Sequence, residues 1–329
     1  MSKIYLTGGE LRRSVFRKLE EWQSSQKAVI LELDLESKTS RPCVEYVSPP
    51  EVCAADLPAI IFKSASLVDG KFYACTSTEI LVYRMPDFRL LHYISLHCFN
   101  DLHHVCPTPQ GTLLAVVTGL DLVVEVSTEG ELLREWCVLD GEDTWARFSR
   151  QVDYRRVPTT KPHHSHPNHV FLLDDEIWVT RFEQRDAISL TRPGRRIQVG
   201  VQRPHDGHVY RDSIYFTTVD GHIVVANRQS LQVERIYNLN EMTGRQTQSL
   251  GWCRGLSTVD ERFLWVGFTR VRPTKFRENL VWLKSAGSYE QVFQPTHLAL
   301  YDLQRGCLED VVFLEPHGLG VVFSLLPAK

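Results

Sequence analysis

A short pattern of strands recurs along this chain of 329 residues and limits its possible folds more than any other feature. Each copy has a short apolar strand, a turn, an aromatic or β-branched strand that ends in Thr or Gly, and another β-branched strand. The copies are marked by Leu67, Val105, Val170, Val209 and Leu256, whose separations are 38, 65, 39 and 47 residues. A four-stranded propeller blade takes about 40–45 residues, so the pattern predicts blades, with an insertion in the longest interval.

The two ends of the sequence together contain the strands of one further blade. The run HGLGVVF at 317–323 has the pattern of an inner strand, and IYLTG at 4–8 matches the second strands IYFTT and IWVTR. With KAVILELDL and CVEYV as third and fourth strands, they form a sixth blade and close the ring, which removes exposed sheet edges. We therefore predict an all-β protein with a single domain over 1–329, a six-bladed β-propeller in which a C-terminal strand joins N-terminal strands. Five or seven blades, or a β-sandwich pair, are the alternatives.

Three long insertions are predicted on one face of this ring. They cover residues 10–26, 141–165 and 271–295. The first has apolar residues at the spacing of a short amphipathic helix. Because loops on a rigid scaffold are where binding and catalytic residues concentrate, we expect these insertions to form a lid over a site.

Composition and charge narrow the possible partners. The 40 acidic and 37 basic residues leave a formal charge of −3, which argues against a general nucleic-acid or membrane-surface binder. The sequence has no apolar run of membrane-spanning length and no signal peptide at its start. Its eight cysteines form no C-x-x-C pair and are expected to be free thiols. We expect a cytoplasmic protein that acts on a small molecule.

Histidines recur at one position of the repeat. The register places His104, His169, His208 and His317 at the start of four inner strands. Inner strands surround the axis of a propeller, so these imidazoles are predicted to converge at the mouth of its channel. Imidazole binds Fe, Mn and Zn, and such a site with open positions would be catalytic. We therefore predict a divalent first-row metal held by these four residues. A metal-free cluster for anion binding or acid–base chemistry, or purely structural histidines, are the alternatives.

A second set of histidines lies just before the first. His103 precedes His104 directly, while His166 precedes His169 and His205 precedes His208 by three residues each. His104, His169, His208 and His317 are called the histidine column below. The same mouth is therefore predicted to contain His103, His166 and His205 as acid–base catalysts.

Arginines are expected beside these histidines. Arg181 and Arg270 directly follow second strands, and Arg254 lies just before the marker position of the fifth repeat. The planar guanidinium group matches carboxylate, sulfate or phosphate. These three residues therefore predict a small anionic substrate.

One stretch resembles a family of propeller proteins. The segments Trp252-Cys253-Arg254-Gly255-Leu256-Ser257 and Trp265-Val266-Gly267-Phe268-Thr269-Arg270 are similar to the R-G-L…V-G-x-[ST]-x-R signature of poorly characterised bacterial six-bladed propellers. Asp101-Leu102-His103-His104 and Pro204-His205-Asp206 resemble further steps of that family. The resemblance implies the fold and a focus on His and Arg positions, and it brings no assigned reaction. In architecture alone, the predicted histidine column is similar to carotenoid-cleaving oxygenases, which hold iron with four histidines from their blades.

Together these features predict a metal-dependent enzyme, of oxygenase or lyase type, that acts on a small anion in a His-lined axial pocket. A role in secondary metabolism or carbohydrate metabolism is expected. One alternative is a non-enzymatic propeller that binds a ligand or protein. The other is a metal-dependent lyase, in which a column histidine removes a proton beside a carboxylate. The sequence contains no P-loop and no nucleophile elbow.

Overall fold

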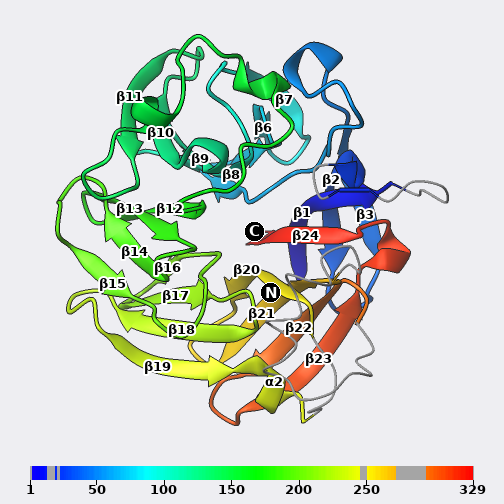
Figure 1. Ribbon diagram of the computed structural model, residues 1–329. Helices are drawn as coiled ribbons and strands as arrows, with labels where there is room; N and C mark the ends of the chain where they lie inside the picture. The colour runs from blue at the N-terminus through cyan, green and yellow to red at the C-terminus, as the bar shows by residue number, and fades with distance from the viewer. Residues whose placement is uncertain (1, 13–18, 21–22, 245–249, 272–293, 329) are drawn as a thin grey trace.

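Six four-stranded antiparallel sheets form a closed ring in the computed structural model of the protein (Figure 1). The structure describes residues 2–12, 19–20, 23–244, 250–271 and 294–328. From the axis outward, the first two blades contain β4 (Ser66–Val68), β5 (Lys71–Cys75), β6 (Ile80–Arg84) and β7 (Arg89–Ile94), then β8 (Leu102–Pro107), β9 (Leu113–Val117), β10 (Leu122–Val126) and β11 (Leu132–Cys137).

The next three blades follow in chain order. They contain β12 (Pro167–Leu173), β13 (Glu176–Arg181), β14 (Asp186–Ser189) and β15 (Arg196–Gln198); β16 (His208–Tyr210), β17 (Ser213–Thr217), β18 (His222–Asn227) and β19 (Val233–Asn238); and β20 (Trp252–Thr258), β21 (Phe263–Thr269), β22 (His297–Asp302) and β23 (Cys307–Phe313). A four-residue helix, α2 (Leu239–Met242), follows β19.

The sixth blade joins the two ends of the chain, as predicted. Its order is β24 (Val321–Pro327), β1 (Lys3–Leu11), β2 (Ser25–Asp34) and β3 (Ser40–Tyr46). In Figure 1 the red strand β24 lies along the blue strand β1, with Ile4 opposite Pro327 and Gly9 opposite Val321. The Thr7 hydroxyl group donates to the Lys63 carbonyl at 2.8 Å, which ties this blade to the segment that leads into the first. The prediction of a six-bladed ring closed by its ends is confirmed.

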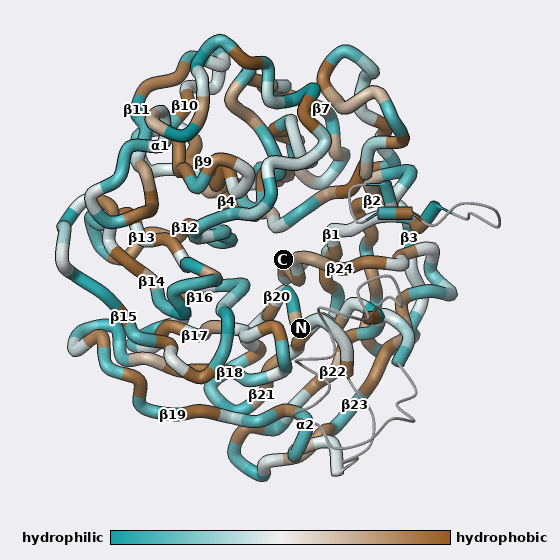
Figure 2. The backbone as a smooth tube through the Cα atoms, viewed as in Figure 1, coloured by the Kyte–Doolittle hydropathy of each residue, from teal (hydrophilic) through white to brown (hydrophobic). Residues whose placement is uncertain are grey.

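The core lies between neighbouring blades. One buried cluster combines Tyr73 and Val82 of the first blade with Val105, Ala115 and Val124 of the second. The residues of β9 are largely hydrophobic (Figure 2). All five are buried, so apolar side chains on both faces of this strand lie in the core. Because each sheet is packed on both faces, the ring is a rigid support for the loops at its ends.

The three predicted insertions have different outcomes. In segment 141–165, α1 (Thr144–Arg147) and a 3₁₀ turn (Tyr154–Arg156) pack Trp145, Phe148 and Tyr154 onto the core of the second blade. For segment 10–26, β1 continues to Leu11 and β2 begins at Ser25, while residues 13–18 and 21–22 of the predicted helix lie outside the described residues. Residues 272–293, nearly all of the third insertion, also lie outside them.

The R-G-L…V-G-x-[ST]-x-R segment packs the fifth blade against β24. Gly255 has a φ of +74°, and a Cβ atom there would lie 2.5 Å from the Phe323 carbonyl oxygen. A Cβ atom on Gly267 would lie 2.5 Å from the carbonyl oxygen of Arg254. The Thr269 hydroxyl group bonds to both the N–H and the C=O of Val322, each at 3.1 Å. The glycines therefore allow a close approach of strands at the seam where the ring closes.

The cysteines agree with the expectation from their spacing. All eight are free, and Cys53, Cys75 and Cys253 are buried. Burial raises the pKa of the Cys75 thiol to about 12, so this side chain stays protonated and inert at neutral pH. Within the described parts of the chain, none of the helices has the length and apolar character needed to cross a membrane.

Candidate functional site

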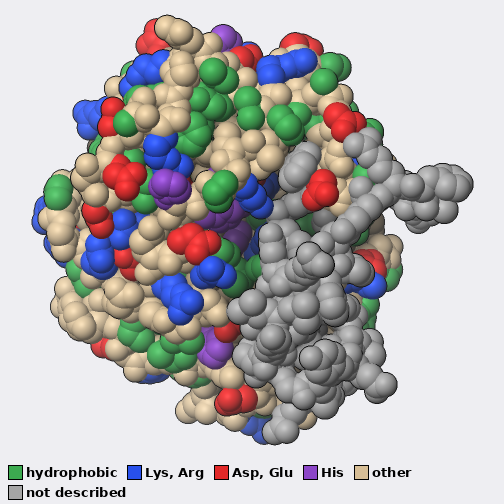
Figure 3. Space-filling view, in the orientation of Figure 1, with side chains coloured by type: hydrophobic (Ala, Val, Ile, Leu, Met, Phe, Trp, Pro, Cys, Tyr) green, Lys and Arg blue, Asp and Glu red, His purple; other side chains and the backbone are tan. Residues whose placement is uncertain are grey.

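A pocket of about 170 Å³ opens near the axis, on the face where loops lead into the inner strands. In Figure 3 histidine and basic side chains gather near the centre of this face. Five of the six blades and the segments before their inner strands contribute lining residues, including Ser25, Ser48, Lys63, Thr76, Thr78, Asp101, His103, His163, His166, Trp252, Arg254, Arg270 and Phe323. The face predicted from the insertions is thus the face that carries the pocket.

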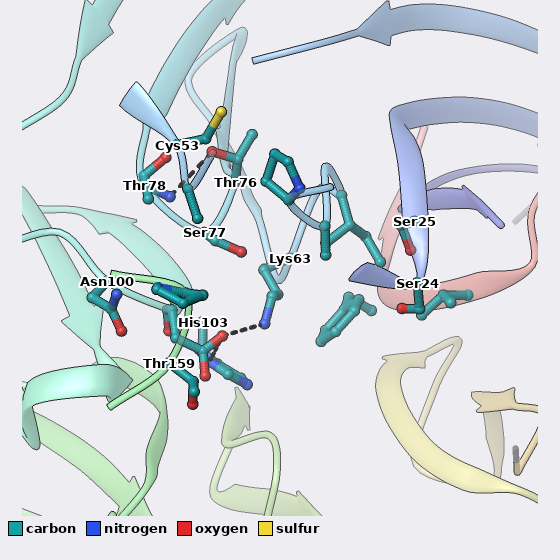
Figure 4. A pocket seen from close by; sticks show the side chains of 18 of the residues that line it. Ser24, Ser25, Cys53, Lys63, Thr76, Ser77, Thr78, Asn100, His103 and Thr159 are labelled. Carbon is teal, nitrogen blue, oxygen red and sulfur yellow. Dashed lines mark hydrogen bonds and ion pairs between the residues drawn. The ribbon is translucent and has the colours of Figure 1, made fainter. Parts of the chain in front are cut away.

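Lys63 places a buried ammonium group inside this pocket. Its backbone N–H donates to the Cys75 carbonyl at 2.8 Å, and its side chain extends into the cavity in Figure 4. The Nζ atom lies 2.8 Å from Oδ1 of Asp101, and only 11% of the lysine side chain is exposed. Burial alone would raise the pKa of Asp101, but Lys63, followed by His103, holds that pKa well below its ordinary value. The Asp101 carboxyl group is therefore ionised at neutral pH.

A second cation lies beside the same aromatic ring. The Arg254 guanidinium group lies 4.6 Å from the ring centroid of Phe323, and Lys63 Nζ lies 5.3 Å from it. A cation over a ring face is attracted by the ring quadrupole, so Phe323 helps to hold both positive charges at the pocket wall. Lys63 and Arg254 thus place two positive charges at this wall of the pocket, and positive charge attracts an anion.

His103 has one defined tautomer. Its Nδ1 atom lies 2.9 Å from the backbone carbonyl oxygen of Asp101, which can only accept a hydrogen bond. Nδ1 therefore carries the proton, and Nε2 keeps its lone pair. Burial, followed by the charge of Lys63, lowers the pKa of His103 well below its ordinary value. The described residues make no hydrogen bond to Nε2, so a basic nitrogen is available to a ligand.

Asp121 shapes the loop that carries the next two histidines. Its buried carboxylate accepts the backbone N–H groups of His164, Ser165 and His166 at 2.9, 3.0 and 2.8 Å. This turn leaves His166 with a φ of +56°, a conformation that side-chain-bearing residues rarely adopt. Three donors and an ion pair with Arg147 at 3.0 Å stabilise it. The strained turn directs His163 and His166 to the pocket wall.

A chain of hydrogen bonds fixes the tautomer of His166. The Thr160 hydroxyl group donates to the Gly119 carbonyl, so its oxygen accepts from His163 Nε2 at 3.3 Å. His163 Nδ1 then carries no proton and accepts a hydrogen bond from the N–H group at His166 Nδ1, at 2.7 Å. His166 Nε2 is left with a lone pair, like that of His103. Burial, followed by the nearby His103 and His163, keeps the pKa of His166 well below its ordinary value.

His205 lies next to these residues but outside the pocket lining. Its ring centroid is 6.0 Å from that of His103, and its Nδ1 atom lies 3.2 Å from Oδ1 of Asp206. Asp206 also accepts the Thr217 hydroxyl group at 2.5 Å and the Gly255 N–H at 2.7 Å. Burial lowers the pKa of His205 despite this carboxylate. The structure thus brings His103, His166 and His205 together, with His205 as a buried neighbour.

The four histidines predicted to bind the metal fall into two groups, because His317 lies away from His104, His169 and His208. The rings of His104 and His169 are stacked at 3.7 Å, and His104 bonds through both nitrogens, to the N–H of Val170 at 3.3 Å and to Ser66 Oγ at 3.2 Å. His208 Nε2 lies 3.3 Å from Thr258 Oγ1.

His317 is not brought to the other three histidines. It ends a 3₁₀ turn (Glu315–His317) four residues before β24, and its Nδ1 atom lies 2.8 Å from Ser40 Oγ on the outermost strand of the sixth blade. Across the described residues, no group of three or more His, Cys, Asp or Glu side chains has the arrangement of a metal site.

The three arginines predicted to bind the substrate lie at different places relative to the pocket. Arg254 lines the pocket. Arg181 does not: it is buried and makes bonds of 2.9 and 2.7 Å to the Asp186 carboxylate, with another of 2.9 Å to the Val138 carbonyl. Arg270 lines the pocket, but both carboxylate oxygens of Glu315 lie 2.7 Å from its guanidinium group. Arg181 therefore links two blades, and Arg270 is neutralised by a neighbour.

Sequence reasoning missed Lys63 and Phe323. A signal for Lys63 is present, because it lies 38 residues before Asp101, the same separation as Leu67 and Val105. Equivalent positions of adjacent blades lie side by side in a propeller, so an opposite-charge pair at one repeat interval predicts an ion pair across a blade boundary. Phe323 carries no comparable signal.

Comparison with known proteins supports the fold alone. Neither a protein-family model nor a curated protein matches the sequence. Among solved structures, a protein of unknown function from Bacteroides caccae matches over 100% of both chains, with a TM-score of 0.63 and 13% sequence identity. Identity at this level carries no residue roles from one protein to the other. The chain is therefore similar in its six-bladed propeller architecture to a protein that itself has no assigned function.

Proposed function

We propose that this propeller is an enzyme that binds a small carboxylate or phosphate ester in its axial pocket and catalyses acid–base chemistry on it. The observation that carries the proposal is the pairing of two imidazoles with bare Nε2 atoms, on His103 and His166, with the buried ammonium group of Lys63 in one pocket. Such a pocket offers a proton acceptor and a positive charge to the same bound molecule.

The positive charges would bind the anionic group of the substrate. Lys63 and Arg254 lie against the Phe323 ring, in a wall that is largely shielded from water. Charges interact more strongly there than in bulk water, because the local dielectric constant is lower. When a proton leaves a carbon beside a carboxylate, negative charge accumulates on the carboxylate oxygens. A cation at that position stabilises the transition state more than the bound substrate.

The neutral histidines would accept the proton. Their lowered pKa values keep both imidazoles unprotonated at neutral pH, so either Nε2 can act as a general base. The imidazolium ion formed on His103 would lie beside the Asp101 carboxylate, whose Oδ1 atom is 3.8 Å from its Nδ1. Charge formed on His166 would be shared with His163 through their Nδ1 atoms.

The predicted metal column does not supply this chemistry. Both nitrogens of His104 are engaged, the ring of His169 stacks on it, and His317 lies at the rim of the sixth blade. Stacked imidazoles direct their nitrogen lone pairs along separate parallel planes, so His104 and His169 do not fit one shared ion. The proposed reaction therefore uses no step at a column metal.

Anion binding is tested by calorimetry with matched lysine variants. We expect pyruvate or glycerol 3-phosphate to bind the wild-type protein, and Lys63→Met to weaken binding at least tenfold. Lys71→Met, which removes an exposed lysine of β5, serves as the control and should bind like the wild type. Equal affinity of all three proteins would contradict the assignment of Lys63 to the anion site.

Acid–base catalysis is tested by exchange of substrate hydrogen with solvent. The protein is incubated in D₂O with bound carboxylates, and the loss of C–H signals is followed by ¹H NMR. Exchange that stops in both His103→Gln and His166→Gln, in protein that still binds the anion, would support the proposal. Binding without exchange of any ligand would instead identify a ligand-binding propeller.

A further inference from the structure

A buried carboxylate sits behind one wall of the pocket and is surrounded by hydroxyl groups. Glu79 is fully buried, and its Oε1 atom accepts from Tyr46 at 2.5 Å and from Tyr93 at 3.1 Å. Its Oε2 atom accepts from Thr76 at 2.7 Å and from Ser48. A carboxylate can take all four hydrogen bonds, so each of these hydroxyl groups directs its hydrogen at Glu79.

Two of these hydroxyl groups, those of Ser48 and Thr76, belong to residues that also line the pocket. Because their hydrogens are used by Glu79, their oxygens present lone pairs and can only accept from a ligand. Thr76 receives the backbone N–H of Thr78 at 3.3 Å, which leaves one of its lone pairs for a ligand. The pocket therefore has an acceptor wall as well as a cationic wall.

The two bare histidine nitrogens extend this set of acceptors. His103 and His166 offer Nε2 lone pairs, and their ring centroids are 5.1 Å apart. Lone pairs of this kind pair with O–H or N–H groups of a ligand. An anion without donors, such as acetate, would leave Ser48, Thr76 and at least one histidine unpaired in a partly dry pocket, which is costly.

The volume of the pocket also exceeds the needs of a simple anion. The cavity of about 170 Å³ holds on the order of ten water-sized groups, since one water needs about 10–15 Å³. A six-carbon sugar acid is of this size, whereas phosphate or acetate would fill a small part of it.

We propose that the ligand is a polyhydroxylated anion, either a sugar acid or a sugar phosphate. Its charged group pairs with Lys63 and Arg254, and its hydroxyl groups donate to the acceptors on Ser48, Thr76, His103 and His166. This inference rests on the proposed function, because it names the substrate class of the same pocket.

Matched ligands separate this inference from the proposed function. Isothermal titration calorimetry of the full chain uses D-gluconate against hexanoate, and glucose 6-phosphate against inorganic phosphate. We expect at least tenfold tighter binding of the hydroxylated member in one pair, and that pair identifies the charged group as carboxylate or phosphate. Equal binding within both pairs would overturn the inference and leave the anion site standing. Failure of all four anions to bind would overturn the proposed function as well.

Variants of the residues around Glu79 test which hydroxyl groups cause the preference for a hydroxylated ligand. Thr76→Val keeps the side-chain volume but removes the acceptor oxygen. The preference for the hydroxylated ligand should therefore fall about tenfold, while the affinity for the matched ligand without hydroxyl groups should not change. Tyr46→Phe removes a Glu79 donor outside the pocket lining and should keep the preference. Thr112→Val, at a similar hydroxyl–carboxylate pair of 2.6 Å with Glu125, controls for the substitution itself. An unchanged preference in folded Thr76→Val would overturn the assignment of the acceptor wall.

Discussion

The Nδ1 atoms of His163 and His166 lie 2.7 Å apart, so one imidazole must donate a hydrogen bond to the other. The direction is set by Thr160, whose hydrogen is directed at the Gly119 carbonyl and whose oxygen faces His163 Nε2. His163 thus orients His166 and selects its tautomer, as outer partners of catalytic histidines commonly do. We regard His163 as a positioning residue for the reaction.

Replacement of His163 should lower turnover more than binding. In His163→Phe the acceptor for His166 Nδ1 is lost, and we expect kcat for solvent exchange to fall about 10–100-fold with KM nearly unchanged. His163→Gln keeps an acceptor oxygen and should restore part of kcat. The measurement is the NMR exchange rate over a range of substrate concentrations. A purely structural His163 would give the same loss in both variants.

The buried histidines should make the fold sensitive to acid. Burial lowers the pKa of His104 to about 4, while the unfolded chain keeps the ordinary value of 6.5. Above pH 6.5 both states are neutral and this residue adds no pH dependence. Between pH 6.5 and 4 only the unfolded state takes up the proton, so the free energy of unfolding falls by about 3 kcal/mol from His104 alone.

Urea denaturation at intervals from pH 7.5 to 4.5 measures this effect. The variant His104→Gln lacks the titrating ring, and its stability should fall less steeply with decreasing pH. His297 behaves similarly, with a pKa lowered to about 4 by burial, so the double variant with His297→Gln should be flatter still. Parallel curves for the variants and the wild type would contradict the assignment.

Arg181 and Arg270 should differ in what they stabilise. Arg181→Met leaves the Asp186 carboxylate buried with one fewer partner, and we expect a loss of about 3–5 kcal/mol without a change in anion affinity. Arg270→Met breaks a partly exposed pair with Glu315, and we expect a loss of about 1 kcal/mol. Urea denaturation and calorimetry measure the two quantities. Lost anion binding in a fully stable Arg181→Met would instead support a substrate-binding role for Arg181.

The close approach at Gly255 can be tested against a glycine in open space. Gly255 and Gly306 have similar φ angles, +74° and +67°, but a Cβ atom on Gly306 would have no neighbour within 4 Å. Gly306→Ala should therefore cost about 1–2 kcal/mol of backbone strain. Gly255→Ala should cost an additional 1–3 kcal/mol, roughly, for the clash with Phe323. Equal losses in thermal or urea unfolding would show that the contact with β24 relaxes freely.

The blades could be predicted from the sequence because their signal is local. Strand alternation, turn residues and the repeat interval are visible within 40 or so residues, and the match of Thr7 to Thr217 in the second strands indicated how the ring closes. The direction of a side chain at a strand end is not local in this sense. Arg181 donates to the Val138 carbonyl, 43 residues away, and His317 lies against Ser40, 277 residues away, so the fold supplies these partners.

The order in which strands are made has a consequence for the nascent protein. The strand β24 leaves the ribosome after the other 23 strands of the ring, yet it lies inside β1, the first to emerge. Until then, β1 keeps a free edge that can pair with another chain, and the pocket lacks Val321 and Phe323. The complete pocket therefore forms only after translation of the whole ring, and a ligand that binds it would favour finished propellers over partial ones in the crowded cell.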